Sequence, residues 1–234
     1  MGQVGVIVVA AGKGTRMGSA VSKQYLPLAG KPVLVHTMEA FEKMELVHSV
    51  VLVIGAGDEE YCSGLVRRYG LVKVSAIVTG GADRQASVYQ GLQALDPEVE
   101  WVLVHDGVRP FISAEEAAGC LEAARAHGAA VLAVPVKDTI KVVGAQGRIE
   151  STPERSTLWA IQTPQAFRVT ELAAAHELAC REGYSGTDDA MLVERAGQAV
   201  YVVEGSYANI KITTPEDLEW AEFRLRQKGE AGNS

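Results

Sequence analysis

The sequence predicts an α/β protein built on a doubly wound, mostly parallel sheet with a protruding β-hairpin arm. First, residues 4–9 form a short apolar run that ends in small residues and glycines, as a buried parallel strand does. Second, apolar strand segments alternate with amphipathic helical segments, which indicates right-handed strand–helix–strand crossovers. Third, this alternation stops at Lys137, where two short β segments flank a glycine-containing turn.

The predicted strands are the apolar segments that end in turn residues or in polar pairs. After residues 4–9 they are 50–54, 72–78, 101–104, 129–134 and 200–204. The predicted helices carry capping residues or acids in their first turns. They cover 58–69, a segment ending at Leu95, 113–126, 170–181, 188–196 and a last helix with Thr214 as N-cap. Ser113 and Glu116 have the spacing of a capping box.

The hairpin is expected at residues 139–143 and 148–152, joined by 144–147. An isolated two-stranded hairpin is only marginally stable in water, so it must pack against something. The pattern alone leaves two alternatives open, which are a second copy of the chain and the hairpin's own domain.

Composition narrows the class of ligand. A chain of 234 residues with 47% apolar residues fits one domain with a full core and an appendage. The net charge of −7 argues against a nucleic-acid binder, which would carry a basic face. A cationic pocket within an acidic protein instead indicates a small anionic ligand.

The cysteines and the N-terminal segment indicate the cellular compartment of the protein. Cys62, Cys120 and Cys180 are odd in number and far apart, so neither a disulfide framework nor a metal motif follows. We therefore expect a reducing, cytoplasmic environment. The apolar run at residues 4–9 is too short to span a membrane, and it lacks a basic leader and a cleavage site, so no membrane association is predicted.

Residues 10–24 are the principal candidate site, because they follow the first strand at the sheet edge where α/β proteins bind ligands. Small residues, Ala10, Ala11, Gly12 and Gly14, let a phosphate approach the backbone N–H groups. Two cations, Arg16 and Lys23, follow and can neutralise its charge. We interpret this segment as a cradle for a triphosphate.

Three alternative interpretations compete for this loop. The dinucleotide fingerprint needs a third glycine where Met17 stands, and an acid about 20 residues later. The ATPase/GTPase phosphate loop needs Gly-Lys-Ser/Thr, whereas Gly12-Lys13 is followed by Gly14. The third alternative is an ordinary glycine-rich turn with solvated cations, which the position after a strand makes less favourable.

Two further segments should reach the same edge, because they follow the third and fourth predicted strands. In residues 80–88, Gly80 and Gly81 can present backbone groups to a base, and Ser87 can add a hydroxyl. The alternative is a tight turn with Ser87 near a helix start.

The second of these segments, residues 105–110, contains Asp106 and Arg109. Asp106 can hold a metal or accept a substrate hydroxyl, while the planar Arg109 fork can grip a phosphate. An internal ion pair between them is the alternative, and His105 is assigned no role.

The remaining polar candidates are scattered and individually typical of surface or caps. They are Thr139, Arg155, Thr163, Thr187, Asp188 and Lys211. Lys211 is the strongest candidate of this group. It lies in the segment that connects the last strand to the last helix, and from there it can point back to the ligand edge. The sequence shows no Ser-His-Asp set and no close carboxylate pair. Charge stabilisation, rather than a protein nucleophile, therefore fits, with attack by an already ionised phosphate.

From about Val4 to Leu225, the chain resembles the 2-C-methyl-D-erythritol 4-phosphate cytidylyltransferases of the non-mevalonate isoprenoid pathway. The number and order of the matching motifs make the resemblance specific. They are AAGKGTRMG, SKQYLPLAGKPVL, GGADRQASV, VHDGVRP, PVKDTIK, LWAIQTPQAF, GTDDA and NIKITTPEDL. The resemblance implies a Rossmann-like nucleotidyltransferase domain over residues 1–228, a dimerisation arm at 137–157 and a frayed tail at 229–234.

The implied reaction joins CTP and methylerythritol 4-phosphate to give the CDP-alcohol and pyrophosphate. The substrate phosphate would attack the α-phosphorus, with Mg²⁺ held mainly by the CTP phosphates and no metal ligand from the protein. The implied catalytic residues are Arg16, Lys23, Arg155 and Lys211. The implied CTP-binding residues are Ala10, Ala11, Gly12, Gly14, Thr15, Gly81, Ala82 and Ser87. The implied substrate-binding residues are Asp106, Arg109, Thr139, Thr163 and Thr187. Because Thr139 and Arg155 lie on the arm, a homodimer would share each site between its subunits.

Two positions depart from the family pattern. Gly107-Val108 replaces the alanines that commonly follow the aspartate, and Ala82 replaces an acid sometimes found after the paired glycines. Asp83, the next residue in the chain, is the nearest acid to this position.

Other functions were compared with this one. A ribitol-5-phosphate cytidylyltransferase has a similar loop and hairpin, but AAG, ASV and GTDDA favour the methylerythritol enzyme. Sugar-1-phosphate and molybdopterin nucleotidyltransferases share the scaffold. The incomplete dinucleotide fingerprint disfavours an oxidoreductase, and the set of cations disfavours a non-catalytic nucleotide sensor.

Overall fold

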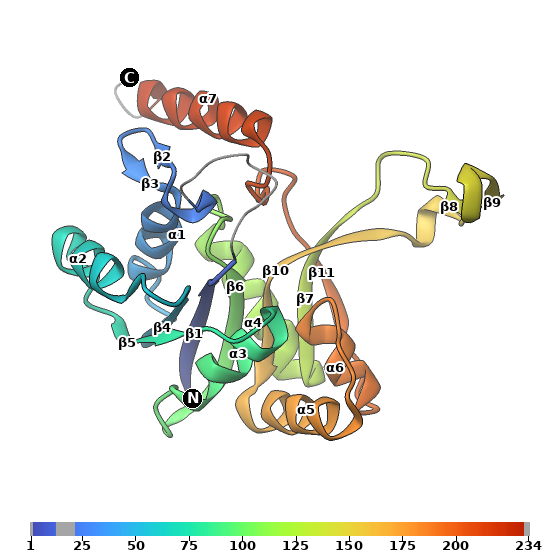
Figure 1. The fold of residues 1–234 in the computed structure, drawn as a ribbon, viewed down its shortest axis with the longest axis horizontal. Coiled ribbons are helices and arrows are strands. Elements are labelled where there is room, and N and C mark those ends of the chain that lie inside the picture. Colours follow the sequence, from blue (N-terminus) through green and yellow to red (C-terminus); the bar gives the residue numbers. More distant parts are fainter. Residues whose placement is uncertain (1, 13–21, 232–234) are drawn as a thin grey trace.

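The computed structural model describes residues 2–12 and 22–231 and confirms the predicted α/β class (Figure 1). Its centre is a seven-stranded sheet of order β11-β7-β10-β6-β1-β4-β5. Every neighbouring pair is parallel except those of β10, which is antiparallel to both β6 and β7. The strands are β1 (Gln3–Ala10), β4 (Ser49–Ile54), β5 (Val74–Thr79), β6 (Val99–Asp106), β7 (Ala129–Pro135), β10 (Trp159–Arg168) and β11 (Tyr201–Glu204).

Helices cover both faces of this sheet. Successive side chains of a strand point to opposite faces, and both faces carry apolar residues that the helices bury. Val6 and Val8 of β1 pack with α1, α2 and α4, whereas Ile7 packs with α3, α5 and α6. The sheet is therefore doubly wound. These helices are α1 (Val33–Glu42), α2 (Glu59–Tyr69), α3 (Arg84–Gln93), α4 (Ala114–His127), α5 (Val169–Glu182) and α6 (Asp189–Arg195).

A third, smaller apolar cluster closes the carboxyl end of the sheet. It joins α7 (Pro215–Ala231) to the short hairpin of β2 (Pro27–Leu28) and β3 (Lys31–Pro32). Val108 and Ile212 take part, and the Ile212 N–H donates to the Val108 carbonyl oxygen at 2.9 Å. The loop that carries Lys211 is thereby fastened to the end of β6.

The capping predictions at Ser113 and Thr214 are confirmed, since the Asp217 N–H donates to Thr214 Oγ1 at 3.4 Å and the box at Ser113 forms. The Glu116 N–H donates to Ser113 Oγ at 3.1 Å, and the Ser113 N–H donates to Glu116 Oε2 at 3.0 Å. At the start of α6, the Met191 N–H donates to Asp188 Oδ1 at 3.0 Å. Asp58 occupies the N-cap position of α2, but its carboxylate accepts from the Tyr25 hydroxyl at 2.8 Å instead of capping the helix.

Several elements, among them β2 and β3, and two helix ends differ from the sequence expectations. Neither β10 nor α1 was expected, since Pro164 and polar residues interrupt the first and an apolar, β-branched stretch opens the second. Helix α3 ends at Gln93 rather than Leu95, although Leu95 still packs in the core. Helix α7 continues to Ala231, beyond the expected end of the domain at residue 228.

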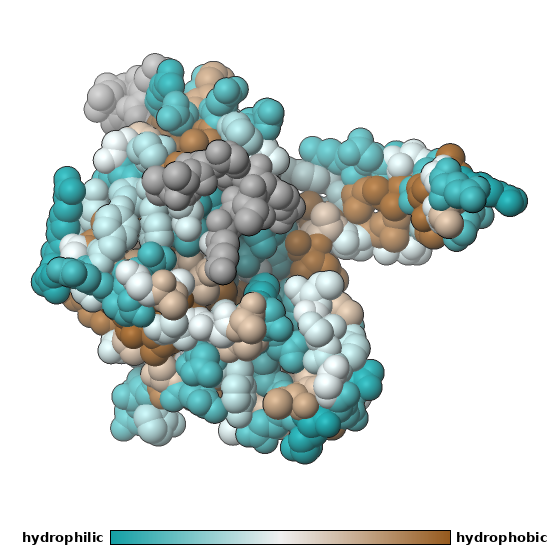
Figure 2. All heavy atoms as spheres, in the orientation of Figure 1, coloured by the Kyte–Doolittle hydropathy of each residue, from teal (hydrophilic) through white to brown (hydrophobic). Residues whose placement is uncertain are grey.

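The hairpin arm projects away from the sheet on the extensions of β7 and β10 (Figure 1). Its strands, β8 (Val142–Val143) and β9 (Ile149–Ser151), are shorter than predicted and enclose the short helix η3 (Ala145–Gly147). Val143 and Ile149 are more than half exposed, and apolar side chains line the arm in Figure 2. The alternative in which the hairpin packs on its own domain is therefore wrong for this structure.

Within the part of the chain that the structure describes, we find no helix with the length and apolar content needed to cross a membrane.

Candidate active site

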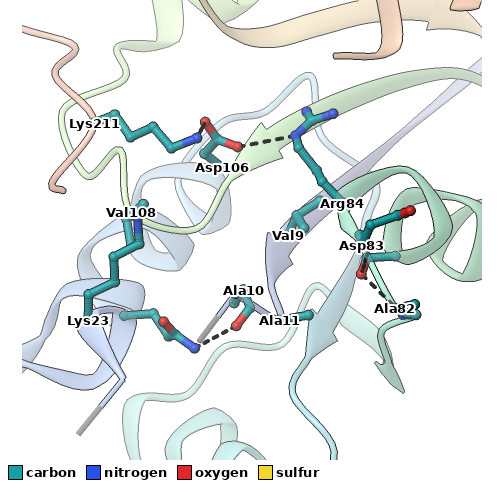
Figure 3. Close-up of a pocket in the computed structure, with 14 residues that line it drawn as sticks. Val9, Ala10, Ala11, Lys23, Ala82, Asp83, Arg84, Asp106, Val108 and Lys211 are labelled. Carbon is teal, nitrogen blue, oxygen red and sulfur yellow. Dashed lines mark hydrogen bonds and ion pairs between the residues drawn. The ribbon is translucent and has the colours of Figure 1, made fainter. Parts of the chain in front are cut away.

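A cavity of about 420 Å³ lies at the carboxyl ends of β1, β5 and β6, where the sequence predicted a shared ligand edge (Figure 3). The loop after β1, the loop before α3, the end of β6 and the segment before α7 all contribute to its wall. The lining residues are Val9, Ala10, Ala11, Gly12, Lys23, Gln24, Gly81, Ala82, Asp83, Arg84, Ser87, Asp106, Val108 and Lys211.

The small residues after β1 form one wall of this cavity, as expected. A Cβ added at Gly12 would meet no atom of the described residues within 4 Å. A Cβ added at Gly80 would lie 2.6 Å from the Ala11 Cβ and 2.7 Å from Ser87 Oγ, so only glycine fits there. The predicted residues Gly14, Thr15 and Arg16 lie outside the described residues.

Lys23 reaches the cavity from η2 (Lys23–Tyr25), which its neighbours fasten to the sheet. Gln24 is buried, and its Nε2 donates to the Ala10 carbonyl oxygen at 2.7 Å. The Tyr25 hydroxyl donates to Asp58 Oδ2 at the start of α2. The lysine therefore has an anchored backbone on the same side of the cavity as the glycine loop.

Ser87 lines the cavity, but its hydroxyl also closes the turn before α3. It accepts from the Gly81 N–H at 3.1 Å and donates to the Asp83 carbonyl oxygen at 2.7 Å. The Gly81 N–H is therefore used within the turn in this structure, while Gly81 still lines the cavity, and its contact with a base stays a prediction. Asp83 also lines the cavity, and its Oδ1 accepts from the Ala86 N–H at 2.7 Å as the N-cap of α3.

Asp106 is surrounded by three cations, so the internal ion pair weighed in the sequence analysis does form. Its Oδ2 lies 2.9 Å from Lys211 Nζ and 3.3 Å from Arg109 Nε, and its Oδ1 lies 3.7 Å from Arg84 Nε. Burial by itself would raise the pKa of the Asp106 carboxyl, but Lys211, Arg84 and Arg109 hold it well below its usual value. Asp106 is consequently an ionised group that holds cations at the end of β6.

Arg109 is buried, and two of its guanidinium nitrogens donate hydrogen bonds within the protein. Besides the contact with Asp106, its Nη1 donates to the Asn209 carbonyl oxygen at 2.7 Å. Arg109 thereby joins the loop after β6 to the segment that carries Lys211.

A chain of hydrogen bonds from the Asp106 N–H through Thr163 to His105 defines which His105 nitrogen carries the proton. The Asp106 N–H donates to Thr163 Oγ1 at 3.0 Å, so the Thr163 hydroxyl hydrogen is left for His105 Nδ1 at 3.2 Å. His105 Nε2–H then donates to the Arg109 carbonyl oxygen at 3.1 Å. Burial lowers the pKa of His105 to about 4, so the imidazole is neutral at pH 7 and supports the loop.

A second cavity of about 210 Å³ adjoins the first and shares Arg84, Asp106 and Lys211 with it. The predicted substrate residues Asp106, Arg109, Thr163 and Thr187 all line it. The other lining residues are Arg84, Ile161, Gln162, Gln165, Asp188 and Lys211. Because the two cavities meet at a carboxylate with three cations, they can bring two anionic ligands together.

Thr139 and Arg155 line neither of these cavities. Both belong to the arm, and Arg155 Nη1 donates to the Lys137 carbonyl oxygen at 3.2 Å. One copy of the chain therefore does not bring them to the other predicted site residues.

Sequence reasoning missed Arg84, Gln24 and Gln165 at this site. Arg84 directly follows the N-cap Asp83 after a glycine pair, a position where a side chain can face a ligand at a helix start. Gln165 accepts from the N–H groups of Asp189 and Ala190 and donates to Asp188 Oδ2. Nothing in the local sequence marks that interaction, because its partners lie more than 20 residues away.

The described residues contain no group of three His, Cys, Asp or Glu side chains that could hold a metal ion. The two Asp106 oxygens face cations, which compete with a metal for the same lone pairs. The described side chains thus offer no cage for a divalent ion.

The doubly wound sheet with a cationic pocket at its carboxyl edge places the chain among the nucleotide-binding α/β proteins. A family model described as 2-C-methyl-D-erythritol 4-phosphate cytidylyltransferase matches residues 4–227. The chain belongs to this family, and it is a nucleotidyltransferase of the cytidylyltransferase type.

Curated relatives and solved structures agree with this assignment. The chain is 51% identical to the 2-C-methyl-D-erythritol 4-phosphate cytidylyltransferase of Alkaliphilus metalliredigens, across 97% of this chain and 94% of the relative. It is 52% identical to the enzyme of that name from Pelotomaculum thermopropionicum, across 97% and 96%. The crystal structure of the Anaerococcus prevotii 4-diphosphocytidyl-2C-methyl-D-erythritol synthase matches with a TM-score of 0.85 and 35% identity, across 96% of each chain.

Proposed function

We propose that the protein transfers CMP from CTP to 2-C-methyl-D-erythritol 4-phosphate and releases pyrophosphate. The observation that carries this proposal is the shared boundary of the two cavities, formed by Arg84, Asp106 and Lys211. The larger cavity, with the glycine loop on its wall, would hold CTP, and the smaller one would hold the alcohol phosphate. The reacting groups would then meet at the boundary, which converts an encounter in solution into a step between positioned groups.

The chemistry needs positioning and charge stabilisation. An oxygen of the alcohol phosphate forms a bond to the α-phosphorus of CTP, the bond from that phosphorus to its β-bridging oxygen breaks, and the electron pair leaves with pyrophosphate. Negative charge builds on the α-phosphoryl oxygens, so fixed cations and backbone amides lower the barrier. Lys23 and Arg16 are the proposed cations, and the amides at Ala10, Ala11 and Gly12 complete the cradle.

The enzymes of this family use a divalent metal ion. We infer that the ion here is Mg²⁺ and that it enters as the magnesium complex of CTP. Magnesium often keeps several waters and binds through substrate phosphates rather than in a protein cage. That behaviour suits a site whose described side chains offer no cage.

The arm supports a homodimer with shared sites. Its exposed apolar residues, Ile140, Val142, Val143 and Ile149, would be covered by the second copy, because an isolated hairpin is marginal in water. Thr139 and Arg155 would then enter the partner's smaller cavity, where one copy of the chain cannot place them. We also expect the enzyme in the cytoplasm, where the buried thiols of Cys62 and Cys120 stay reduced.

One assay tests the reaction. Purified protein is incubated with CTP and Mg²⁺, and pyrophosphate release is measured with either methylerythritol 4-phosphate or ribitol 5-phosphate. We expect release with methylerythritol 4-phosphate at a kcat/KM at least about 100-fold higher, which corresponds to about 3 kcal/mol of discrimination. Faster turnover of ribitol 5-phosphate would replace the proposal with the runner-up function, and no release with either would overturn both.

A further inference from the structure

Arg84 opens helix α3 at the boundary between the two cavities and is a candidate ligand contact that the sequence did not indicate. Its Nη1 lies 2.7 Å from Asp189 Oδ2, and its Nε lies 3.7 Å from Asp106 Oδ1. The side chain nevertheless stays 25% exposed and lines both cavities. Figure 3 shows the guanidinium at the end of β6, beside the Asp106 carboxylate.

The Asp189 carboxylate, which pairs with Arg84, is itself held by further buried contacts. Asp189 is fully buried, and its Oδ1 lies 3.0 Å from His176 Nε2. The His176 ring stacks on Tyr89 of α3, with ring centroids 5.9 Å apart. The Asp189 N–H donates to Gln165 Oε1 at 3.2 Å. The Arg84 guanidinium is therefore held in one orientation by a network from α3, α5, α6 and β10.

Both partners of this pair are charged. Burial would raise the pKa of Asp189, but the Arg84 guanidinium and the His176 ring hold it below its usual value. Burial would lower the pKa of Arg84, but Asp189 and Asp106 raise it further above its usual value. A fixed cation thus stands where two anionic phosphates have to meet.

Arg84 has more donors than its two carboxylate partners use. A guanidinium carries five N–H groups in a rigid fork. Nε and Nη1 face Asp106 and Asp189, and among the described residues no hydrogen-bond partner is found for Nη2. A fork that grips carboxylates on one side and has donors left on the other matches the geometry of phosphate recognition.

We propose that Arg84 binds the phosphate of the alcohol substrate with these remaining donors, and that Asp189 and His176 are positioning residues that orient the guanidinium. This inference rests on the proposed function, because that function places the alcohol phosphate in the smaller cavity. The wild-type assay with methylerythritol 4-phosphate tests the proposed function, whereas the Arg84 variants test only the inference.

The first experiment compares Arg84→Ala and Arg84→Lys with wild type by steady-state kinetics and by calorimetric binding of CTP. For Arg84→Ala we expect kcat/KM for the alcohol phosphate to fall about 10²- to 10³-fold, as when one fixed donor is lost at a reacting phosphate. KM for the alcohol phosphate should rise at least about tenfold, while the Kd of CTP stays within about threefold. Arg84→Lys should show a smaller loss with the same pattern, because lysine keeps the charge but not the fork.

Arg195 provides a matched control on helix α6. It forms a comparable pair with a carboxylate, at 2.6 Å from Glu182 Oε2, but lies on the surface and lines neither cavity. Arg195→Ala should leave both kinetic constants unchanged. An Arg84→Ala enzyme with kcat/KM within about threefold of wild type would overturn the inference, and so would equal losses of affinity for CTP and the alcohol phosphate.

Chemical rescue separates a phosphate contact from a structural role. Added guanidinium at low millimolar concentration should restore part of the activity of Arg84→Ala, beyond an equal concentration of NaCl, and should not activate the wild type. Failure of guanidinium to restore activity, in a variant with the melting temperature of the wild type, would count against a direct contact.

A double-mutant cycle tests the positioning role of Asp189. Asp189→Asn keeps the shape of the side chain but removes the charge that holds Arg84 and replaces one of its two acceptor oxygens with an NH2 donor. If Asp189 acts through Arg84, the variant Arg84→Ala/Asp189→Asn should be no slower than Arg84→Ala alone. The double variant also leaves no unpaired buried carboxylate, so if Arg84→Ala folds poorly it replaces that variant in the kinetic comparison with wild type. Additive losses would show that Asp189 does not act through Arg84.

Discussion

Gln24 Nε2 donates a hydrogen bond to the carbonyl oxygen of Ala10 across 2.7 Å, and this contact joins the end of β1 to the segment that carries Lys23. Both partners are buried, so the bond is shielded from water. The end of β1 and the segment that carries the cavity lysine are thus held together, although 12 residues separate Ala10 from Lys23 and most of them lie outside the described residues.

Lys23→Ala should lower kcat with little change in CTP affinity, because its ammonium meets charge that develops only during transfer. We expect a loss of about 10²- to 10³-fold in kcat, which is the effect of removing one prepositioned donor. Pre-steady-state release of pyrophosphate and calorimetric titration with CTP measure the two quantities. Lys43→Ala, an exposed change at the end of α1, is the control. An unchanged kcat would remove Lys23 from the proposed mechanism.

Arg155→Ala should slow the enzyme, and mixing it with Lys23→Ala should restore activity if the arms are exchanged. In a mixed dimer, the cavity with an intact Lys23 would receive the arm with an intact Arg155. After random exchange of equal amounts, about a quarter of the sites are then intact, because half of the dimers are mixed and each has one such site. Activity after refolding the mixture, compared with each variant refolded alone, measures this. No recovery in demonstrably mixed dimers would contradict a shared site.

Gly80→Ala should both destabilise the protein and weaken CTP binding, because its Cβ would displace Ala11 and Ser87. Overpacking of this kind costs about 1–3 kcal/mol of unfolding free energy. Gly64→Ala is a matched control in helix α2, where a Cβ meets no atom of the described residues within 4 Å. That change should stabilise the protein by about 0.4–1 kcal/mol. Urea unfolding and CTP titration of both variants are the measurements, and equal CTP affinity in the two would be evidence against a tight loop at Gly80.

His105→Gln should weaken the dependence of the free energy of unfolding on pH between about 4 and 6.5. The pKa of buried His105 falls to about 4, whereas the unfolded chain has about 6.5, so the unfolded state binds more protons between these values. Stability therefore decreases as pH falls from 6.5 to 4, by about 3 kcal/mol from this group alone. Glutamine can still accept from Thr163 and donate to the Arg109 carbonyl. Urea unfolding from pH 4 to 7 should show a shallower slope in the variant, and parallel profiles would contradict the assignment.

The sheet edge that carries the site could be predicted, because it depends on local patterns. Apolar runs that end in glycine or in His-Asp fix where the parallel strands stop, and parallel strands share one edge. Asp106 and Lys211 could be named for this reason. Arg84 could not, since its role comes from Asp189, which lies 105 residues further along the chain.

Strand β10 shows the opposite case, in which long-range pairing overrides the local pattern. Its centre contains Gln162, Thr163, Pro164 and Gln165, and only Ala166 and Phe167 read as a buried strand. These polar side chains are buried because they bond to Asn209, His105 and Asp188, which come from other elements. No pattern of hydrophobicity contains that information.

The place of β10 between β6 and β7 also sets the order in which the molecule can be assembled. A nascent chain that has released residues 1–135 has both neighbours of β10 but not the strand that joins them. Until residues 159–168 emerge from the ribosome, one edge of β6 is unpaired. Strands β7 and β11 then have no strand that pairs them with the rest of the sheet. Translation must therefore run through the whole arm before the two halves of the sheet can close, and a pause within residues 137–157 would prolong the exposure of an edge prone to aggregation.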